Sequence, residues 1–142
     1  MPGAVKRVYE PASRHDGTRI LVDRLWPRGL TKARAKIDEW LRDLAPSNEL
    51  RRWYHAHPEQ WSDFRKKYLK ELKRPECQAA LHRLYELAHQ KKWLTLLFAS
   101  KNETHNNAVV LKELLEGGRK PPTGTGPAAA HAMRRGAAVR RR

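Results

Sequence analysis

The sequence predicts an α/β domain with a small, mostly parallel sheet of about three strands, flanked by several helices. Two observations predict this class. Residues 18–25 and 93–100 contain short apolar runs of the kind found in strands buried on both faces. The long segment between them shows apolar residues at helical spacing, and a connection of that length suits parallel strands better than a hairpin. We therefore expect the two runs to be parallel neighbours.

The strands are expected in the following order. Residues 5–10 indicate a short strand of mixed character, with Val5, Arg7 and Tyr9 on one face and Lys6, Val8 and Glu10 on the other. Residues 18–25 form the second strand, which ends at Trp26-Pro27 because proline cannot donate to a sheet. Residues 93–100 are apolar almost throughout and are expected at the centre of the sheet.

Five helices are expected from apolar positions that fall on one helical face. Ser47 is the expected N-cap of the second helix, either Asn102 or Thr104 that of the last, and Gly117-Gly118 ends the last. The apolar positions are Ile37, Trp40, Leu41 and Leu44; Leu50, Trp53 and Tyr54; Trp61, Phe64, Tyr68, Leu69 and Leu72; Cys77, Ala80, Leu81, Leu84 and Ala88; and Ala108, Val109, Leu111, Leu114 and Leu115.

The positive charge is unevenly distributed. The chain contains 30 Lys and Arg against 15 Asp and Glu, a net charge of +15 that makes an anionic partner a reasonable expectation. All acidic residues lie before position 117, so we expect a domain over residues 1–118 and a disordered basic tail over 119–142. The tail would attract nucleic acid without sequence preference, or it is an extension with no role. Its clustered arginines are Arg134, Arg135, Arg140, Arg141 and Arg142.

Charged and polar side chains follow both strong strands. Because the carboxyl ends of parallel strands lie at one edge of a sheet, these segments should converge there. The first backbone N–H groups of the last helix should lie at the same edge, and helix N-termini favour anions. The sequence therefore predicts a crevice for a phosphate or carboxylate, with Arg24, Arg28, Lys101 and Asn106 as anion-binding candidates.

Asp23 and His105 are the candidates for catalysis at this edge. Asp23 could orient an arginine, and imidazole is the side chain that exchanges protons near neutral pH. The alternative is a structural ion pair between Asp23 and Arg24 or Arg28. No catalytic triad, nucleophile elbow or Gly-rich phosphate loop is present, so the sequence leaves open whether the protein is an enzyme.

Other residues argue against cofactors and secretion. His55 and His57 are two positions apart and do not share a helical face, so no metal site is predicted, and no cofactor motif is found. The single cysteine, Cys77, favours buried packing and a reducing compartment. With no signal segment or apolar span, a cytoplasmic protein is expected.

The aromatic stripe between the strong strands is expected in the core, because its spacing fits one helical face. The alternative is that it stacks bases beside the basic run at residues 65–74. A solvated helix face is an adequate explanation of that run. The stripe consists of Trp53, Trp61, Phe64 and Tyr68.

Four blocks together resemble the bacterial domain of unknown function 488 family in its short YeaO-like form. They are DGTRILVDRLWPRG, the tryptophan at 40, LAPSNELRRWYHAHPEQWSDFRKKYLKEL and TLLFASKNETHNNAVVLKELL, and they cover about residues 5–116. The resemblance implies a compact α/β domain of unassigned activity, and it adds Arg51 and Arg52 to the anion-binding candidates. Longer relatives place Cys-His-Arg where this chain reads Thr104-His105-Asn106, so the resemblance implies that a thiol is missing here.

Three functions remain open at this point. The first is an α/β domain that binds the phosphate or carboxylate of a small molecule or of a nucleic-acid end. The second is a non-catalytic protein that associates with nucleic acid through its basic surface and tail. The third is a structural or partner-binding domain. The sequence does not indicate the oligomeric state.

Overall fold

The computed structural model describes residues 3–117. It contains a four-stranded sheet in which every strand is parallel to its neighbours. The two strong strands are neighbours, as predicted, and the second lies inside the sheet with all its residues buried. The order across the sheet is β1 (Gly3–Arg7), β4 (Leu94–Phe98), β2 (Thr18–Leu21) and β3 (Glu39–Trp40).

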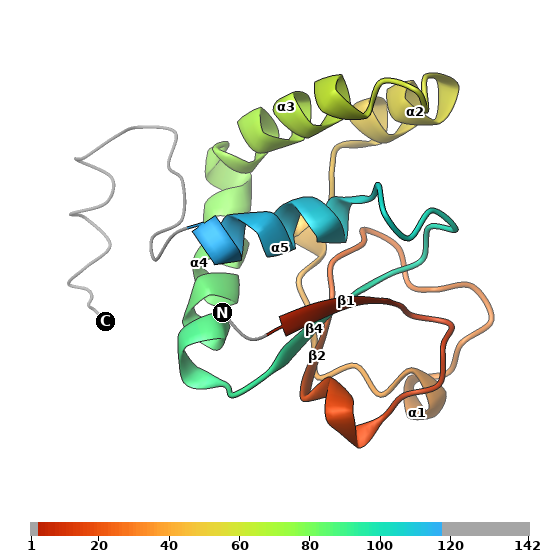
Figure 1. Ribbon diagram of the computed structural model, residues 1–142, viewed down its shortest axis with the longest axis vertical. Helices are drawn as coiled ribbons and strands as arrows, with labels where there is room; N and C mark the ends of the chain where they lie inside the picture. The colour runs from red at the N-terminus through yellow and green to blue at the C-terminus, as the bar shows by residue number, and fades with distance from the viewer. Residues whose placement is uncertain (1–2, 118–142) are drawn as a thin grey trace.

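The helices are α1 (Lys32–Ala35), α2 (Asn48–Ala56), α3 (Trp61–Leu72), α4 (Pro75–Gln90) and α5 (Asn107–Gly117), with 3-10 turns η1 (Arg14–Asp16) and η2 (Arg42–Leu44). Helices α2, α3 and α4 follow one another along the chain before β4, and α5 follows β4 (Figure 1). Ser47 caps α2 by accepting a hydrogen bond from Leu50 N–H, and Pro75 occupies the first turn of α4. Within residues 3–117 no helix is long and apolar enough to cross a lipid bilayer.

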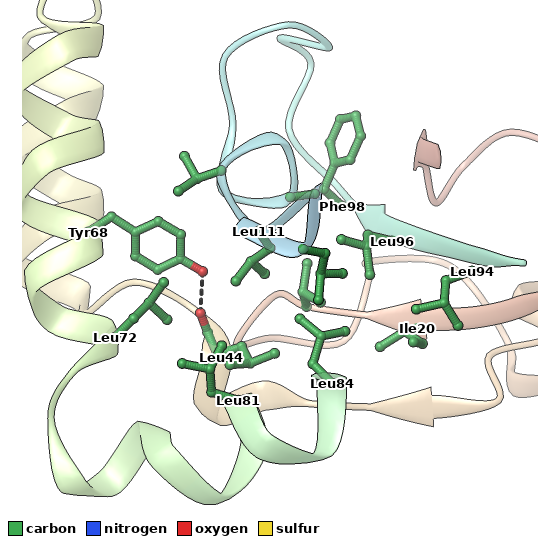
Figure 2. Close-up of a cluster of buried hydrophobic side chains, with 14 of the residues drawn as sticks. Ile20, Leu44, Tyr68, Leu72, Leu81, Leu84, Leu94, Leu96, Phe98 and Leu111 are labelled. Atoms are coloured by element: carbon green, nitrogen blue, oxygen red, sulfur yellow. Dashed lines mark hydrogen bonds between the residues drawn. The ribbon is translucent and has the colours of Figure 1, made fainter. Parts of the chain in front are cut away.

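The two faces of the sheet support separate cores. On one face the buried side chains of β2 and β4 pack against α2 to α5 in the larger cluster, part of which Figure 2 shows. Tyr68 of α3 is fully buried there and donates its hydroxyl to the carbonyl of Leu44. On the other face Val8, Leu21 and Leu97 form a smaller cluster. Adjacent residues of one strand therefore enter different cores, which is why both strands are apolar without alternation.

The helix predicted over Ile37, Trp40, Leu41 and Leu44 is wrong. The backbone there pairs with β2 instead, since Leu41 N–H donates to the carbonyl of Leu21 at 2.9 Å and β3 forms a fourth strand. Ile37 and Trp40 pack in the smaller core, whereas Leu41 and Leu44 pack in the larger one. Their helical spacing therefore does not reflect a helix. It arises because a short strand and the turn after it contribute apolar side chains to both faces of the sheet.

A buried arginine fastens the segment before β3 to the start of β2. Arg19 is 4% exposed and donates to the carboxylate of Asp16 at 2.5 Å and to the carbonyls of Ala35 and Lys36 at 2.8 and 3.1 Å. Burial acts to raise the pKa of Asp16, but hydrogen bonds from Ser13 N–H and from the Lys6 and Arg19 cations outweigh it and hold that pKa below its ordinary value.

Gly17 sits where the chain turns into β2 and allows a test of this packing. Its φ is +64°, and a Cβ atom there would lie 2.4 Å from the carbonyl oxygen of Trp93. We expect Gly17→Ala to lower the free energy of unfolding in urea by about 2 to 4 kcal/mol, because backbone strain and a clash with main-chain atoms add together.

Gly29 is the matched control. Its φ is +83°, but a Cβ atom would meet nothing within 4 Å, so Gly29→Ala should cost only the backbone strain, about 1 kcal/mol. Equal losses for the two variants would contradict the close approach of Gly17 to Trp93.

Candidate functional site

The carboxylate of Asp23 joins the ends of β2 and β4 to the start of α5. Its Oδ2 accepts a hydrogen bond from Ala99 N–H at 2.8 Å, and its Oδ1 accepts one from the Asn107 amide at 3.2 Å. The same amide donates to the carbonyl of Val22 at 3.0 Å, and Trp40 Nε1 donates to the carbonyl of Asp23 at 2.7 Å. The segments that follow the two strong strands therefore converge, as their parallel order predicts.

Asp23 is held by hydrogen bonds and not by the ion pair that was the alternative. Within the described residues no salt bridge joins Asp23 to Arg24 or Arg28. Burial is the largest influence on the carboxyl and raises its pKa, while the Ala99 N–H, the Asn107 amide and the positive charge of Arg51 act to lower it. Arg51 on α2 therefore acts on Asp23 through its charge alone, and no hydrogen bond or salt bridge joins the two within the described residues.

Asn106 is the N-cap of α5, in place of the predicted Asn102 or Thr104. Its Oδ1 accepts a hydrogen bond from Val109 N–H at 3.1 Å, and its Nδ2 donates to the carbonyl of Asn102 at 2.8 Å. The Asn102 side chain instead orders the preceding loop by accepting from the N–H groups of Thr104 and His105. The buried Asn106 side chain is thus engaged in shaping the start of α5.

The cations predicted for this edge have few hydrogen-bond or salt-bridge partners. Arg24 donates to the carbonyl of Ala45 at 3.3 Å, and its buried Nε has no hydrogen-bond partner among the residues described. Arg28 and Lys101 are exposed, as is Arg51. None of these four side chains forms a salt bridge in the part of the chain that the structure covers.

Sequence reasoning missed two residues from the end of β1. Arg7 Nε donates to the carbonyls of Ala99 and Ser100 at 3.3 and 3.1 Å, and its guanidinium lies 5.0 Å from the ring centroid of Tyr9. The Tyr9 hydroxyl donates to the carbonyl of Arg28 at 3.0 Å. The strand predicted over residues 5–10 would have placed both residues within it, whereas β1 ends at Arg7, and this earlier end brings Arg7 and Tyr9 to the edge where the parallel strands finish.

His105 is placed by an aromatic contact. Its ring stacks on Trp61 of α3, with centroids 4.6 Å apart and an interplanar angle of 11°. Trp61 in turn stacks on Phe64, and Tyr54 packs against both rings. Among residues 3–117 the imidazole has no hydrogen-bonding carboxylate, so the structure does not pair His105 with Asp23 as an acid and base.

The remaining sequence candidates do not form a metal or thiol site. The described residues include no group of three His, Cys, Asp or Glu side chains placed to hold a metal ion. His57 stacks on Trp53 and contacts its carbonyl through Nδ1 at 2.9 Å. Cys77 is buried on α4, and burial raises the pKa of its thiol. The arginines of the tail, Arg134, Arg135, Arg140, Arg141 and Arg142, lie outside the described residues.

The fold and this edge define a small parallel α/β domain whose strand ends carry exposed cations. A family model described as "Inactive DUF488-N3 subclade" matches residues 4–128. The chain belongs to the domain of unknown function 488 family, as the four sequence blocks indicated.

Curated relatives agree with this assignment. The chain is 47% identical over 110 residues to an uncharacterized protein of Escherichia coli K12, YeaO, an alignment that covers 78% of this chain and 93% of the relative. It is 41% identical over 113 residues to uncharacterized proteins of Mycobacterium bovis (Mb3100c) and Mycobacterium tuberculosis H37Rv (Rv3073c), covering 80% of this chain and 92% of each relative. No solved structure matches the chain significantly.

The raised pKa of Asp23 predicts a pH dependence of stability. Because the folded protein holds this proton more tightly than the unfolded chain, the stability due to protonation is fully present below the ordinary pKa of 3.8 and is lost as the pH rises through the folded pKa. We compare the free energy of unfolding of the parent with that of Asp23→Asn. The difference, parent minus variant, should fall as the pH rises from 3.8 through the folded pKa of Asp23, and it should stay constant at higher pH. Urea unfolding between about pH 3 and pH 7 measures this difference.

The sign of that slope is decisive. A difference that grows with rising pH would mean that the hydrogen bonds from Ala99 and Asn107 outweigh burial, and the assigned direction would then be wrong.

Proposed function

We propose that this domain binds a small anion, a phosphate or a carboxylate, at the edge where its parallel strands end, and that it does so without catalysing a reaction. The observation that carries the proposal is that Asp23 joins the ends of β2 and β4 to the start of α5, while the basic residues proposed for this edge have no carboxylate within salt-bridge distance in the described residues. These side chains are Arg24 and Arg28 after β2, Lys101 after β4 and Arg51 on α2.

Repulsion between the four cations favours the binding of an anionic ligand at this edge. Like charges held near one another repel, and neither the exposed Glu103 after β4 nor the exposed Glu10 after β1 pairs with any of the four cations within residues 3–117. Asp23 offsets part of this charge, but its oxygens already accept hydrogen bonds from Ala99 and Asn107. An oxyanion would accept charge-assisted hydrogen bonds from guanidinium groups, whose planar donors suit phosphate and carboxylate.

Three points support binding without chemistry. The matching family model is described as inactive. The resemblance to the family implies that Thr104 stands where longer relatives place a cysteine, so no thiol nucleophile is expected at that position. His105 stacks on Trp61, and Asp23 is engaged by the main chain, so neither forms the hydrogen-bonded pair that general acid–base catalysis uses.

A thermal-shift titration with sulfate tests the proposal. The melting temperature of the parent should rise with sulfate concentration, because a ligand that binds only the folded state stabilises it. Arg28→Ala removes an exposed guanidinium whose side chain has no partner in the described structure, so it should reduce the sulfate-dependent rise by at least half while leaving the melting temperature without sulfate nearly unchanged.

Arg34→Ala is the matched control, since Arg34 is an exposed arginine of α1 with no place in the proposed site. Sulfate also stabilises proteins through exclusion from their surface, and this general effect should be equal in both variants. Equal rises in the parent, Arg28→Ala and Arg34→Ala would exclude sulfate binding at the strand ends.

A further inference from the structure

A second basic feature lies between α2 and α3 and shares no residue with the strand-end edge. It is an open groove of about 760 Å³. Helix α2 supplies its aromatic surface, and α3 with the turn that follows supplies its cations. The lining residues are Ser47, Glu49, Leu50, Trp53, Lys67, Lys70, Glu71, Lys73 and Arg74.

The side chains that line this groove carry a net positive charge. Four cations line it against two carboxylates, and one of these carboxylates is already engaged. Glu71 accepts hydrogen bonds from the N–H and hydroxyl of Ser47 at 2.8 and 2.5 Å and lies 3.8 Å from Arg74. The three lysines have no salt bridge in the part of the chain described, so the groove offers ammonium groups to an anionic ligand.

The four cations form a row that begins on α3 and continues into the turn that follows it. Lys67 and Lys70 occupy positions i and i+3 of the helix, which places them on one side, and Lys73 and Arg74 come directly after the end of α3 at Leu72. At 1.5 Å of rise per residue, Lys67 and Lys70 are offset by about 4.5 Å along the helix axis. This offset is of the same order as the rise of about 3.4 Å per nucleotide in a stacked nucleic-acid strand. A repeating phosphate backbone can therefore engage several of these cations in succession.

Trp53 adds a planar apolar surface beside this row. Its indole is half-buried, and the ammonium of Lys67 lies 3.7 Å from the ring centroid. Phe64 and Tyr68 of the same aromatic stripe are buried in the core, so they cannot stack on a ligand. A lysine is a mobile, strongly hydrated cation, so a ligand can draw Lys67 away from the indole without disturbing the fold.

We propose that this groove binds single-stranded nucleic acid. The phosphates lie along the lysine row, one base stacks on Trp53, and Lys67 moves from the indole to a phosphate when the strand binds. The combination of a basic track with an aromatic platform is the arrangement that sequence-independent single-strand binding uses. An acidic peptide would satisfy the lysines, but its carboxylates would leave the indole without a planar partner.

Fluorescence anisotropy of a labelled oligothymidylate of about 15 nucleotides tests the proposal on the full chain. Trp53→Leu keeps an apolar side chain but removes the stacking surface, and it should weaken binding about tenfold. Replacing Lys67, Lys70 and Lys73 together with glutamine should lower the slope of log K against log salt by about 2 in magnitude.

The matched control replaces the exposed Lys32, Lys91 and Lys92 with glutamine, an identical change in net charge outside the groove. All variants keep residues 118–142, so any contribution from that segment is common to them. Circular dichroism melts would check that each variant is folded. The control should retain the affinity and salt slope of the parent.

Three outcomes would overturn the proposal. They are unchanged affinity in Trp53→Leu, equal losses in the groove and control triple variants, and competition by oligoglutamate that matches unlabelled oligothymidylate at equal charge. The last outcome would identify a peptide-binding groove. The sulfate titration remains independent, because Arg28→Ala should leave oligothymidylate binding unchanged and Trp53→Leu should leave the sulfate response unchanged.

Discussion

One largely buried carboxylate, that of Asp23, holds together the edge on which the candidate site is built. A buried charge is costly unless it is hydrogen-bonded, and here main-chain Ala99 and the Asn107 amide supply those bonds. The result is that the end of β2, the end of β4 and the first turn of α5 share one connection. Without it the N–H of Ala99 would lose its acceptor, and the segments that carry Arg24 and Lys101 would lose their common anchor.

This role of Asp23 changes the functional interpretation of its neighbours. A carboxylate that is committed to the fold positions the surrounding cations, and it is poorly placed to exchange protons with a substrate. Arg51 lies near enough to lower its pKa, yet it and Arg28 remain exposed and without salt bridges in residues 3–117. The edge thus combines a rigid interior with outward-facing donors, which is an arrangement that suits binding.

The sequence predicted the parallel sheet and the convergence of its strand ends, because apolar runs and their order are local properties. It failed at β3, where Ile37 and Leu41 fit a helical period although they enter opposite cores. The stacking of His105 on Trp61 could not be predicted either, since it depends on how α3 packs over the loop before α5. The same holds for Arg51, which only the family resemblance suggested and whose charge acts to lower the pKa of Asp23.

Residue-resolved hydrogen exchange of the Ala99 amide tests the role of Asp23 most directly. In the parent this N–H should be protected, because the Asp23 carboxylate accepts it at 2.8 Å. In Asp23→Ala it should exchange at least about 100-fold faster, while the amides of Leu96 and Leu97 inside β4 keep most of their protection. Equal protection of Ala99 in both proteins would show that other contacts hold the strand ends together, and it would contradict the central role of the Asp23 carboxylate.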